Sequence, residues 1–278
     1  MGIRPVDKAT VNAYDKGMES LQSPQVVALN GPAKDKAGTM TGRAVGRRPP
    51  EPPQPRGLRR GSLTPELIVK ESLRLLDSGG AFSLPKLGRA LGADPTAVYR
   101  HFASKDDVVL AIADRLIEEA MAGMESRACW VDTVIEGTRR LRAVYLAHPA
   151  AASLSASRTT RGPGEMQAVN FLIGAVLKAG FEGAEAVRIY RALGDFSLFW
   201  AGGEAGFLAL DERAQATERA AWAAYLAVDR AEFPHIWQVR RELQEVADDD
   251  IFDTILSLVI NGLMQRAPRP CGCGAHRG

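Results

Sequence analysis

Apolar residues recur every three or four positions from Thr64 onward, which is the spacing of one face of an α-helix. A clear example is the stripe formed by Val108, Ile112 and Leu116. No stretch of the chain alternates apolar and polar residues in the way that a half-buried β-strand does. The hydrophobic pattern therefore predicts an all-α protein.

The first part of this pattern predicts short helices over roughly residues 64–78, 83–91, 95–102 and 104–124. Hydroxyl side chains that can cap a helix N-terminus stand at Thr64, Ser83 and Ser104. Gly92 supplies a turn between the second and third helices. Short capped helices around a tight turn indicate a compact helical head.

Longer helices follow over residues 131–149, 165–180, 182–210 and 248–267, whereas residues 211–233 form an amphipathic helix or partly a loop. The last helix is apolar on two faces, since Phe252 and Val259 share one face and Ile251 and Leu258 share another. Its own domain can cover one face and a second subunit the other. A fully internal helix pair in a monomer is the alternative.

Composition divides the chain into segments. We expect residues 1–61 to form a disordered leader rich in Pro and Arg, with 11 Lys and Arg against 5 Asp and Glu in the first 62 residues. Residues 62–122 form the head, residues 123–267 a larger helical body and residues 268–278 a flexible tail. The charge of the leader suggests an anionic partner, and a solubilising extension is the alternative.

The whole chain is 46% hydrophobic and 24% charged, with a net charge of +2. It contains no apolar run long enough to span a bilayer, and its first residues lack the apolar segment of a secretory signal. We therefore expect a cytoplasmic protein that does not bind a membrane. The three cysteines, Cys129, Cys271 and Cys273, are not expected to make a disulfide framework.

The head has the layout of a helix-turn-helix, in which a second short helix enters the major groove of DNA. Leu84, Leu87 and Leu91 give its first helix an inner face, and Val98 and Phe102 do so for the helix after the turn. The outward side carries residues suited to DNA, because an arginine can bond a guanine edge and hydroxyls can bond bases or phosphates. The predicted DNA-contacting residues are Thr64, Ser83, Pro95, Thr96, Ala97, Tyr99, Arg100, His101 and Lys105.

Each of these residues also has an ordinary structural interpretation. Tyr99 could close the small core, His101 could be structural, and Arg100 could be a solvated surface side chain. The head is also not broadly basic, with 7 Lys and Arg against 9 Asp and Glu over residues 63–122. The spacing of the polar residues after a capped helix and a glycine turn is what favours DNA binding.

The stretch "LGRALGADPTAVYRHFASKDDVVLAIAD" resembles the DNA-binding signature of the TetR (tetracycline-repressor-like) transcriptional regulators. The residues that match this signature are Gly92, Tyr99, His101, Phe102, Lys105 and Asp106. The resemblance implies an all-α fold with an N-terminal three-helix helix-turn-helix head and a larger helical body for ligand binding and dimerisation. The 60-residue leader departs from the pattern, because most members begin close to the first helix.

The body resembles the ligand-binding and dimerisation domain of the tetracycline-repressor subgroup, through segments such as His148-Pro149, Leu177–Phe181 and "DIFDTILSLVINGL". The resemblance implies a homodimer that binds a pseudo-palindromic operator in double-stranded DNA, and a small-molecule inducer that releases it. Aromatic and polar residues in the body can line an apolar pocket or belong to the core. The predicted pocket residues are His148, Phe171, Phe196 and Trp200. His148 could equally bond a helix-end carbonyl.

Other functional classes find less support. The chain has no phosphate-binding loop, no Gly-x-Ser-x-Gly and no His-Glu-x-x-His, so an enzyme is not expected. Cys271, Cys273 and His276 in the tail offer three ligands for a soft metal, but no second pair at zinc-finger spacing. No cofactor and no metal are predicted. A protein-interaction module without DNA is the third alternative, and it has little need for the Tyr-Arg-His triplet beside Lys105.

Overall fold

The computed structural model describes residues 63–79 and 82–271. The predicted leader, residues 1–61, lies outside the described residues. Within the part that the structure describes, the regular elements are helices and there is no strand, so the predicted all-α class is confirmed. In the same part, no helix is long and apolar enough to cross a bilayer.

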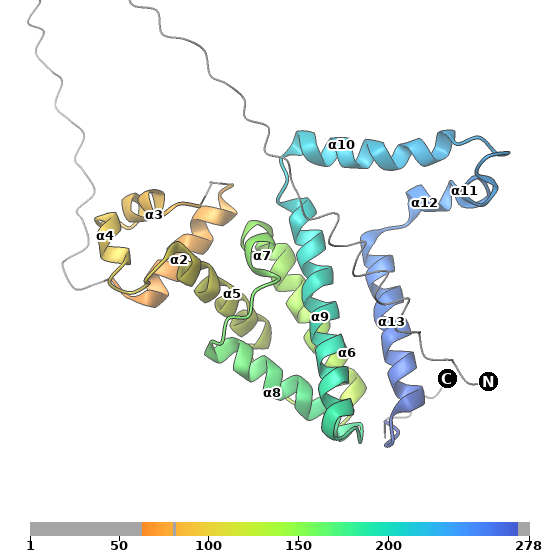
Figure 1. Cartoon of the computed structure of the whole chain (residues 1–278), viewed down its shortest axis with the longest axis horizontal. Helices are drawn as coiled ribbons and strands as arrows, with labels where there is room; N and C mark the ends of the chain where they lie inside the picture. Colours follow the sequence, from red (N-terminus) through yellow and green to blue (C-terminus); the bar gives the residue numbers. More distant parts are fainter. Residues whose placement is uncertain (1–62, 80–81, 272–278) are drawn as a thin grey trace, which may run out of the picture. The chain divides into compact units, whose positions relative to one another are not determined.

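The head consists of short helices followed by one long helix (Figure 1). These are α2 (Pro65–Asp77), α3 (Leu84–Ala90), α4 (Pro95–Val98) and α5 (Lys105–Met121). The predicted caps form, since Thr64 accepts a hydrogen bond from the Leu67 N–H at 3.2 Å and Ser104 accepts one from the Asp107 N–H at 3.1 Å. Ser83 caps α3 through the N–H of Lys86 at 3.4 Å.

The helix α4 is shorter than predicted. It ends at Val98 rather than near Phe102, although the N–H groups of His101 and Phe102 still donate to the Val98 carbonyl at 3.0 and 3.1 Å. A single helical turn therefore carries the chain from α4 towards α5. Val98 is completely buried in an apolar cluster, and Phe102 is half-buried and packs against that cluster.

The body begins with helices that pack on one another: α6 (Trp130–Ala147), α7 (Pro149–Ser155), α8 (Pro163–Lys178) and α9 (Gly183–Leu208). It continues through α10 (Glu212–Ala223), a short 3₁₀ helix (Ala224–Ala227), α11 (Pro234–Val239), α12 (Glu242–Glu245) and α13 (Asp248–Arg266). The helix α7 was not predicted. The sequence predicts one helix that ends at Pro149, but this proline occupies the first turn of α7, where a missing N–H costs nothing.

The apolar side chains gather in two clusters. The first joins the head to the body, because Ile68, Leu87 and Leu116 of the head share it with Tyr145 of α6 and Ala205 of α9. The second lies at the other end of the body. It includes Trp130, Phe181, Leu193, Phe252, Leu256 and Ile260. The helix α13 therefore buries one stripe within its own chain.

A disulfide joins Cys129, which precedes α6, to Cys271 after α13, across 142 positions of sequence. The prediction that the cysteines form no disulfide framework was wrong for this pair. The spacing carries no sign of it, because only the fold brings the two Cα atoms to 5.6 Å. The start of the predicted flexible tail is also anchored, since Cys271 is buried and the Arg269 N–H donates to the Ala179 carbonyl at 2.9 Å.

Candidate nucleic-acid interface and cavity

The segment after the Gly92 turn carries a polar edge, which consists of the exposed residues Thr96, Tyr99, Arg100 and His101. Gly92 has a φ of 60°, a left-handed conformation that favours glycine, and it redirects the chain from α3 into α4. The Asp94 carboxylate caps α4 by accepting hydrogen bonds from the Thr96 N–H at 2.8 Å and the Thr96 hydroxyl at 2.7 Å. The hydrogen bond from the Thr96 hydroxyl lowers the pKa of the Asp94 carboxyl most, and the hydrogen bond from the Thr96 N–H lowers it further. The start of α4 is thus held by a charged cap.

Burial separates the two sides of this segment. Val98 is completely buried, whereas Tyr99 is 53% exposed and Thr96, Arg100 and His101 are exposed as well. Ala97 is half-buried. Pro95 begins α4, but its side chain lies outside what the structure describes. Consecutive residues around one helical turn therefore present polar groups to solvent while a single valine anchors them.

The flanking positions lie on neighbouring helix starts. Thr64 is exposed at the start of α2, and Ser83 is half-buried at the start of α3. The pKa of Glu66 is lowered by its own backbone N–H and then by the Thr64 hydroxyl, with a smaller contribution from His101. Lys105 is exposed at the start of α5, with its Nζ 5.4 Å from the centre of the Phe82 ring.

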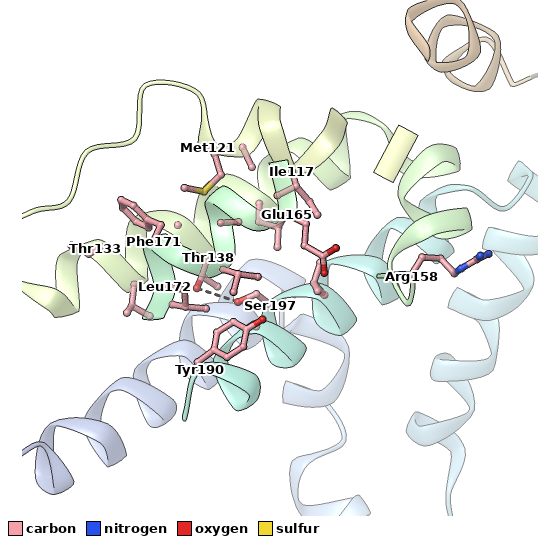
Figure 2. A pocket seen from close by; sticks show the side chains of 18 residues that line it. Ile117, Met121, Thr133, Thr138, Arg158, Glu165, Phe171, Leu172, Tyr190 and Ser197 are labelled. Atoms are coloured by element: carbon pink, nitrogen blue, oxygen red, sulfur yellow. Dashed lines mark hydrogen bonds between the residues drawn. The ribbon is translucent and has the colours of Figure 1, made fainter. Parts of the chain in front are cut away.

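A partly open cavity of about 130 Å³ lies between α5 of the head and α6, α8 and α9 of the body (Figure 2). Phe171 lines it as predicted, but His148, Phe196 and Trp200 are not among its lining residues. Phe196 stacks on Phe252 of α13 at 6.5 Å, and Trp200 borders a wide cleft beside α10 and α13. Phe196 and Trp200 therefore lie on a different face of α9 from the residues that line the cavity. Their spacing in the sequence did not reveal this.

His148 contacts the head instead of the cavity. Its Nδ1 lies 3.0 Å from the Asp77 carboxylate at the end of α2, and its Nε2 lies 3.7 Å from Glu119 on α5. Helix α6 ends at Ala147 and α7 begins at Pro149, so His148 lies at the junction of the two helices. This histidine links the head to the body.

The wall of the cavity is also tied to α5 by ion pairs and hydrogen bonds that the sequence did not predict. Arg158, which lines the cavity, donates to the Asp106 carboxylate in the first turn of α5 at 2.7 Å. Asp114, buried on α5, accepts hydrogen bonds from the Thr160 hydroxyl at 2.7 Å and the Glu165 N–H at 2.9 Å. The segment 158–165 therefore belongs to both the cavity wall and the junction with the head.

Polar groups inside the cavity are few. Thr138 and Ser197 are buried with their hydroxyl oxygens 3.3 Å apart. Tyr190 also lines the cavity, and burial raises the pKa of its hydroxyl. Within the described part of the chain, no group of three His, Cys, Asp or Glu residues is placed to hold a metal ion.

Two family models match the chain. Residues 68–112 match the bacterial regulatory proteins of the tetR family, and residues 122–267 match the tetracyclin repressor-like C-terminal domain. An HTH-type transcriptional regulator of Saccharopolyspora erythraea is 32% identical over 206 residues, which are 73% of this chain and 84% of that protein. The tetracycline repressor protein class A from transposon 1721 of Escherichia coli is 27% identical over 214 residues, or 73% of this chain and 92% of the repressor.

Among solved structures, the TetR family protein ActR of Streptomyces coelicolor, crystallised with actinorhodin, superposes with a TM-score of 0.65. The match covers 75% of this chain and 99% of ActR at 22% identity, so it shows a likeness of fold. The fold agrees with both family models, since it has a helical head followed by a larger helical body beside a cavity. The chain belongs to the tetR family of bacterial regulatory proteins, and it is a DNA-binding regulator of transcription.

Proposed function

We propose that this regulator is a homodimeric repressor that a small molecule releases from its operator. The observation that carries the proposal is the polar edge around α4, where Thr96, Tyr99 and Arg100 are exposed beside the buried Val98. A short helical turn can enter the major groove of DNA. There, an exposed arginine can donate hydrogen bonds to a guanine edge, and the neighbouring hydroxyls can bond phosphates or bases. The proposed function is therefore binding rather than catalysis. The binding takes place at an operator in the bacterial cytoplasm.

Apolar side chains that the chain itself leaves uncovered on α9 and α13 support a dimer. Phe199 on α9 is 61% exposed, and Leu258 on α13 is 67% exposed although the opposite face of α13 is buried. Large apolar side chains on adjacent long helices are typical of subunit interfaces. A two-fold dimer would present two α4 edges to two half-sites of a pseudo-palindrome.

The response to a ligand would pass through the shared segment 158–165. Any molecule that changes the position of Arg158 or Glu165 also disturbs their links to Asp106 and Asp114 on α5. Because α5 follows the polar edge directly, its movement would change the separation of the two heads. The ligand must bind the state that does not bind DNA more tightly, since otherwise it shifts nothing.

Selection of fragments from the source genome by the purified full-length protein tests the proposal. We expect a common pseudo-palindromic motif with half-site centres about 10 base pairs apart, or a multiple of that spacing. Footprinting should protect both half-sites. Recovery of fragments with no shared motif would contradict the proposal.

The leader can be tested on the same fragments. We expect removal of residues 1–61, which carry an excess of Lys and Arg, to weaken binding and to flatten its salt dependence. An unchanged affinity and salt slope would assign the leader no role in DNA binding.

A further inference from the structure

The charged side chains at the cavity already have hydrogen-bond partners. Among the described residues that line it, Arg158 and Glu165 are the charged ones. Arg158 donates to Asp106 at 2.7 Å, and Glu165 accepts from the Arg161 N–H at 2.6 Å. An anionic ligand would have to displace Asp106 from Arg158 or remain buried near Glu165 without a partner, and both are costly. The cavity therefore disfavours an anion.

The size of the cavity limits the group that enters it. At about 130 Å³ it is close to the roughly 150 Å³ of an enclosed apolar cavity that takes up one benzene ring. Its walls are mostly apolar, with Ile117, Met121, Leu141, Phe171 and Leu172 among them. One six-membered ring, or an alkyl group of that volume, matches the size of this space.

The hydroxyl pair gives this apolar space a polar side with a definite direction. Ser197 donates its single proton to the Leu193 carbonyl at 2.8 Å. In the 3.3 Å contact between the two hydroxyls, Thr138 must therefore be the donor and Ser197 the acceptor. The remaining lone pairs of both oxygens can only accept hydrogen bonds. Figure 2 shows the pair among the residues that line the cavity.

We infer that the effector is a largely apolar molecule without a negative charge, whose buried part is about one ring in size and carries a hydrogen-bond donor, such as a phenol or an alcohol, directed at Thr138 and Ser197. This inference rests on the proposal that the cavity holds the effector. It adds the chemical class of that molecule. A carboxylate cannot donate a hydrogen bond to the hydroxyl pair, and Arg158, the cation of the described lining, is already paired with Asp106. A purely apolar ring leaves the hydroxyl pair without a hydrogen-bond donor.

Fluorine NMR titrations of the full-length protein, without DNA, test the inference with three matched probes. These are para-fluorophenol, para-fluorotoluene and para-fluorobenzoate. We expect the phenol to bind at least tenfold more tightly than the benzoate. Equal or tighter binding of the benzoate, or no detectable binding of the phenol at millimolar concentration, would overturn the inference. Failure to find an operator would leave these titrations unaffected, so the two proposals fail separately.

Two pairs of variants locate the site. A Cβ at Gly194 would make only ordinary contacts with Tyr190 and Leu172, both of which line the cavity, so Gly194→Leu fills the space. We expect it to abolish phenol binding, whereas Gly174→Leu, on an open part of α8, should leave binding unchanged. An unchanged affinity in Gly194→Leu would place the probe elsewhere and overturn the inference.

Thr138→Val removes the hydroxyl at nearly constant volume. It should weaken the phenol roughly three- to tenfold, in line with the loss of one hydrogen bond, and leave para-fluorotoluene within about twofold. Thr217→Val, on the exposed surface of α10, is the matched control. Equal losses for both probes would contradict the role of the hydroxyl pair. Should Thr138→Val not fold, the order of the probes on the unaltered protein and the effect of Gly194→Leu still decide the matter.

Discussion

The carboxylate of Asp114 on α5 accepts a hydrogen bond from the backbone N–H of Gly164, in the first turn of α8, at 3.1 Å. The two residues are 50 positions apart in sequence, and Asp114 is 8% exposed. A Cβ at Gly164 would lie 2.6 Å from the Asp114 carbonyl oxygen, so only glycine allows the helices to approach this closely. The last helix of the head is thus fixed to a helix that lines the cavity.

Replacing Asp114 by Asn should weaken this junction. The amide still fills the space, but it loses the charge that strengthens three hydrogen bonds from α8 and the loop before it. We expect the free energy of unfolding to fall by about 1–3 kcal/mol, measured by urea denaturation. Asp253→Asn, which alters an exposed ion pair with Arg139, should cost less than about 0.5 kcal/mol. Equal losses in the two variants would remove the special role of Asp114.

The ion pair between Asp106 and Arg158 should be visible in a carboxyl titration. The hydrogen bond from the Arg158 guanidinium lowers the pKa of Asp106 below the value of about 3.9 expected in an unfolded chain. A depressed pKa in the folded state means that the stabilisation is present at neutral pH. It is lost as the pH falls through the folded pKa.

Carbon NMR of the Asp106 carboxyl is the measurement, and Arg158→Ala should return its midpoint to the ordinary range. Glu136, whose pKa is lowered by the hydrogen bond from Arg127, should not respond to that substitution. A midpoint that Arg158→Ala leaves unchanged would show that the pair does not form in solution.

The disulfide between Cys129 and Cys271 should stabilise the body, because it closes a long loop in the unfolded chain. We expect Cys129→Ser to lower the free energy of unfolding by about 2–4 kcal/mol under oxidising conditions. Cys273→Ser, at the cysteine outside the described residues, should have little effect. Peptide mapping that finds Cys271 joined to Cys273, or all thiols free, would contradict the pairing.

The uncovered face of α13 should hold the dimer together. Leu258→Arg places a charge at a position that is 67% exposed in one chain, and we expect sedimentation to show a monomer. Met166→Arg, at a 63% exposed position near the start of α8, should leave the dimer intact. A dimer that persists in Leu258→Arg would place the interface on another surface.

Much of the head could be predicted from sequence, because local rules decide it. Thr64, Ser83 and Ser104 cap helices through their own neighbouring N–H groups, so the signal lies within three residues of each cap. The apolar spacing likewise identified Val98 as the inward residue of α4. The length of α4 was overestimated, since hydrogen bonds of a single turn continue the helical pattern beyond its end.

The cavity and its links could not be predicted in the same way. Phe171, Phe196 and Trp200 all lie on apolar helices, and only the packing of α8 and α9 against α5 and α6 decides which of them face the cavity. A single Asp114 within a helix carries no pattern, because its partners lie 46–51 positions away. Long-range pairings of this kind are set by tertiary structure rather than by local spacing.

The affinity of Arg100→Ala for a selected operator tests the central claim most directly, since that claim assigns DNA reading to the exposed turn after α4. We expect a gel shift to show a loss of about 1–3 kcal/mol in binding free energy and a relaxed preference at one base pair of each half-site. Arg115→Ala, at an exposed arginine on α5 outside this edge, should bind as the unaltered protein does. Unchanged affinity and sequence preference in Arg100→Ala would contradict the account.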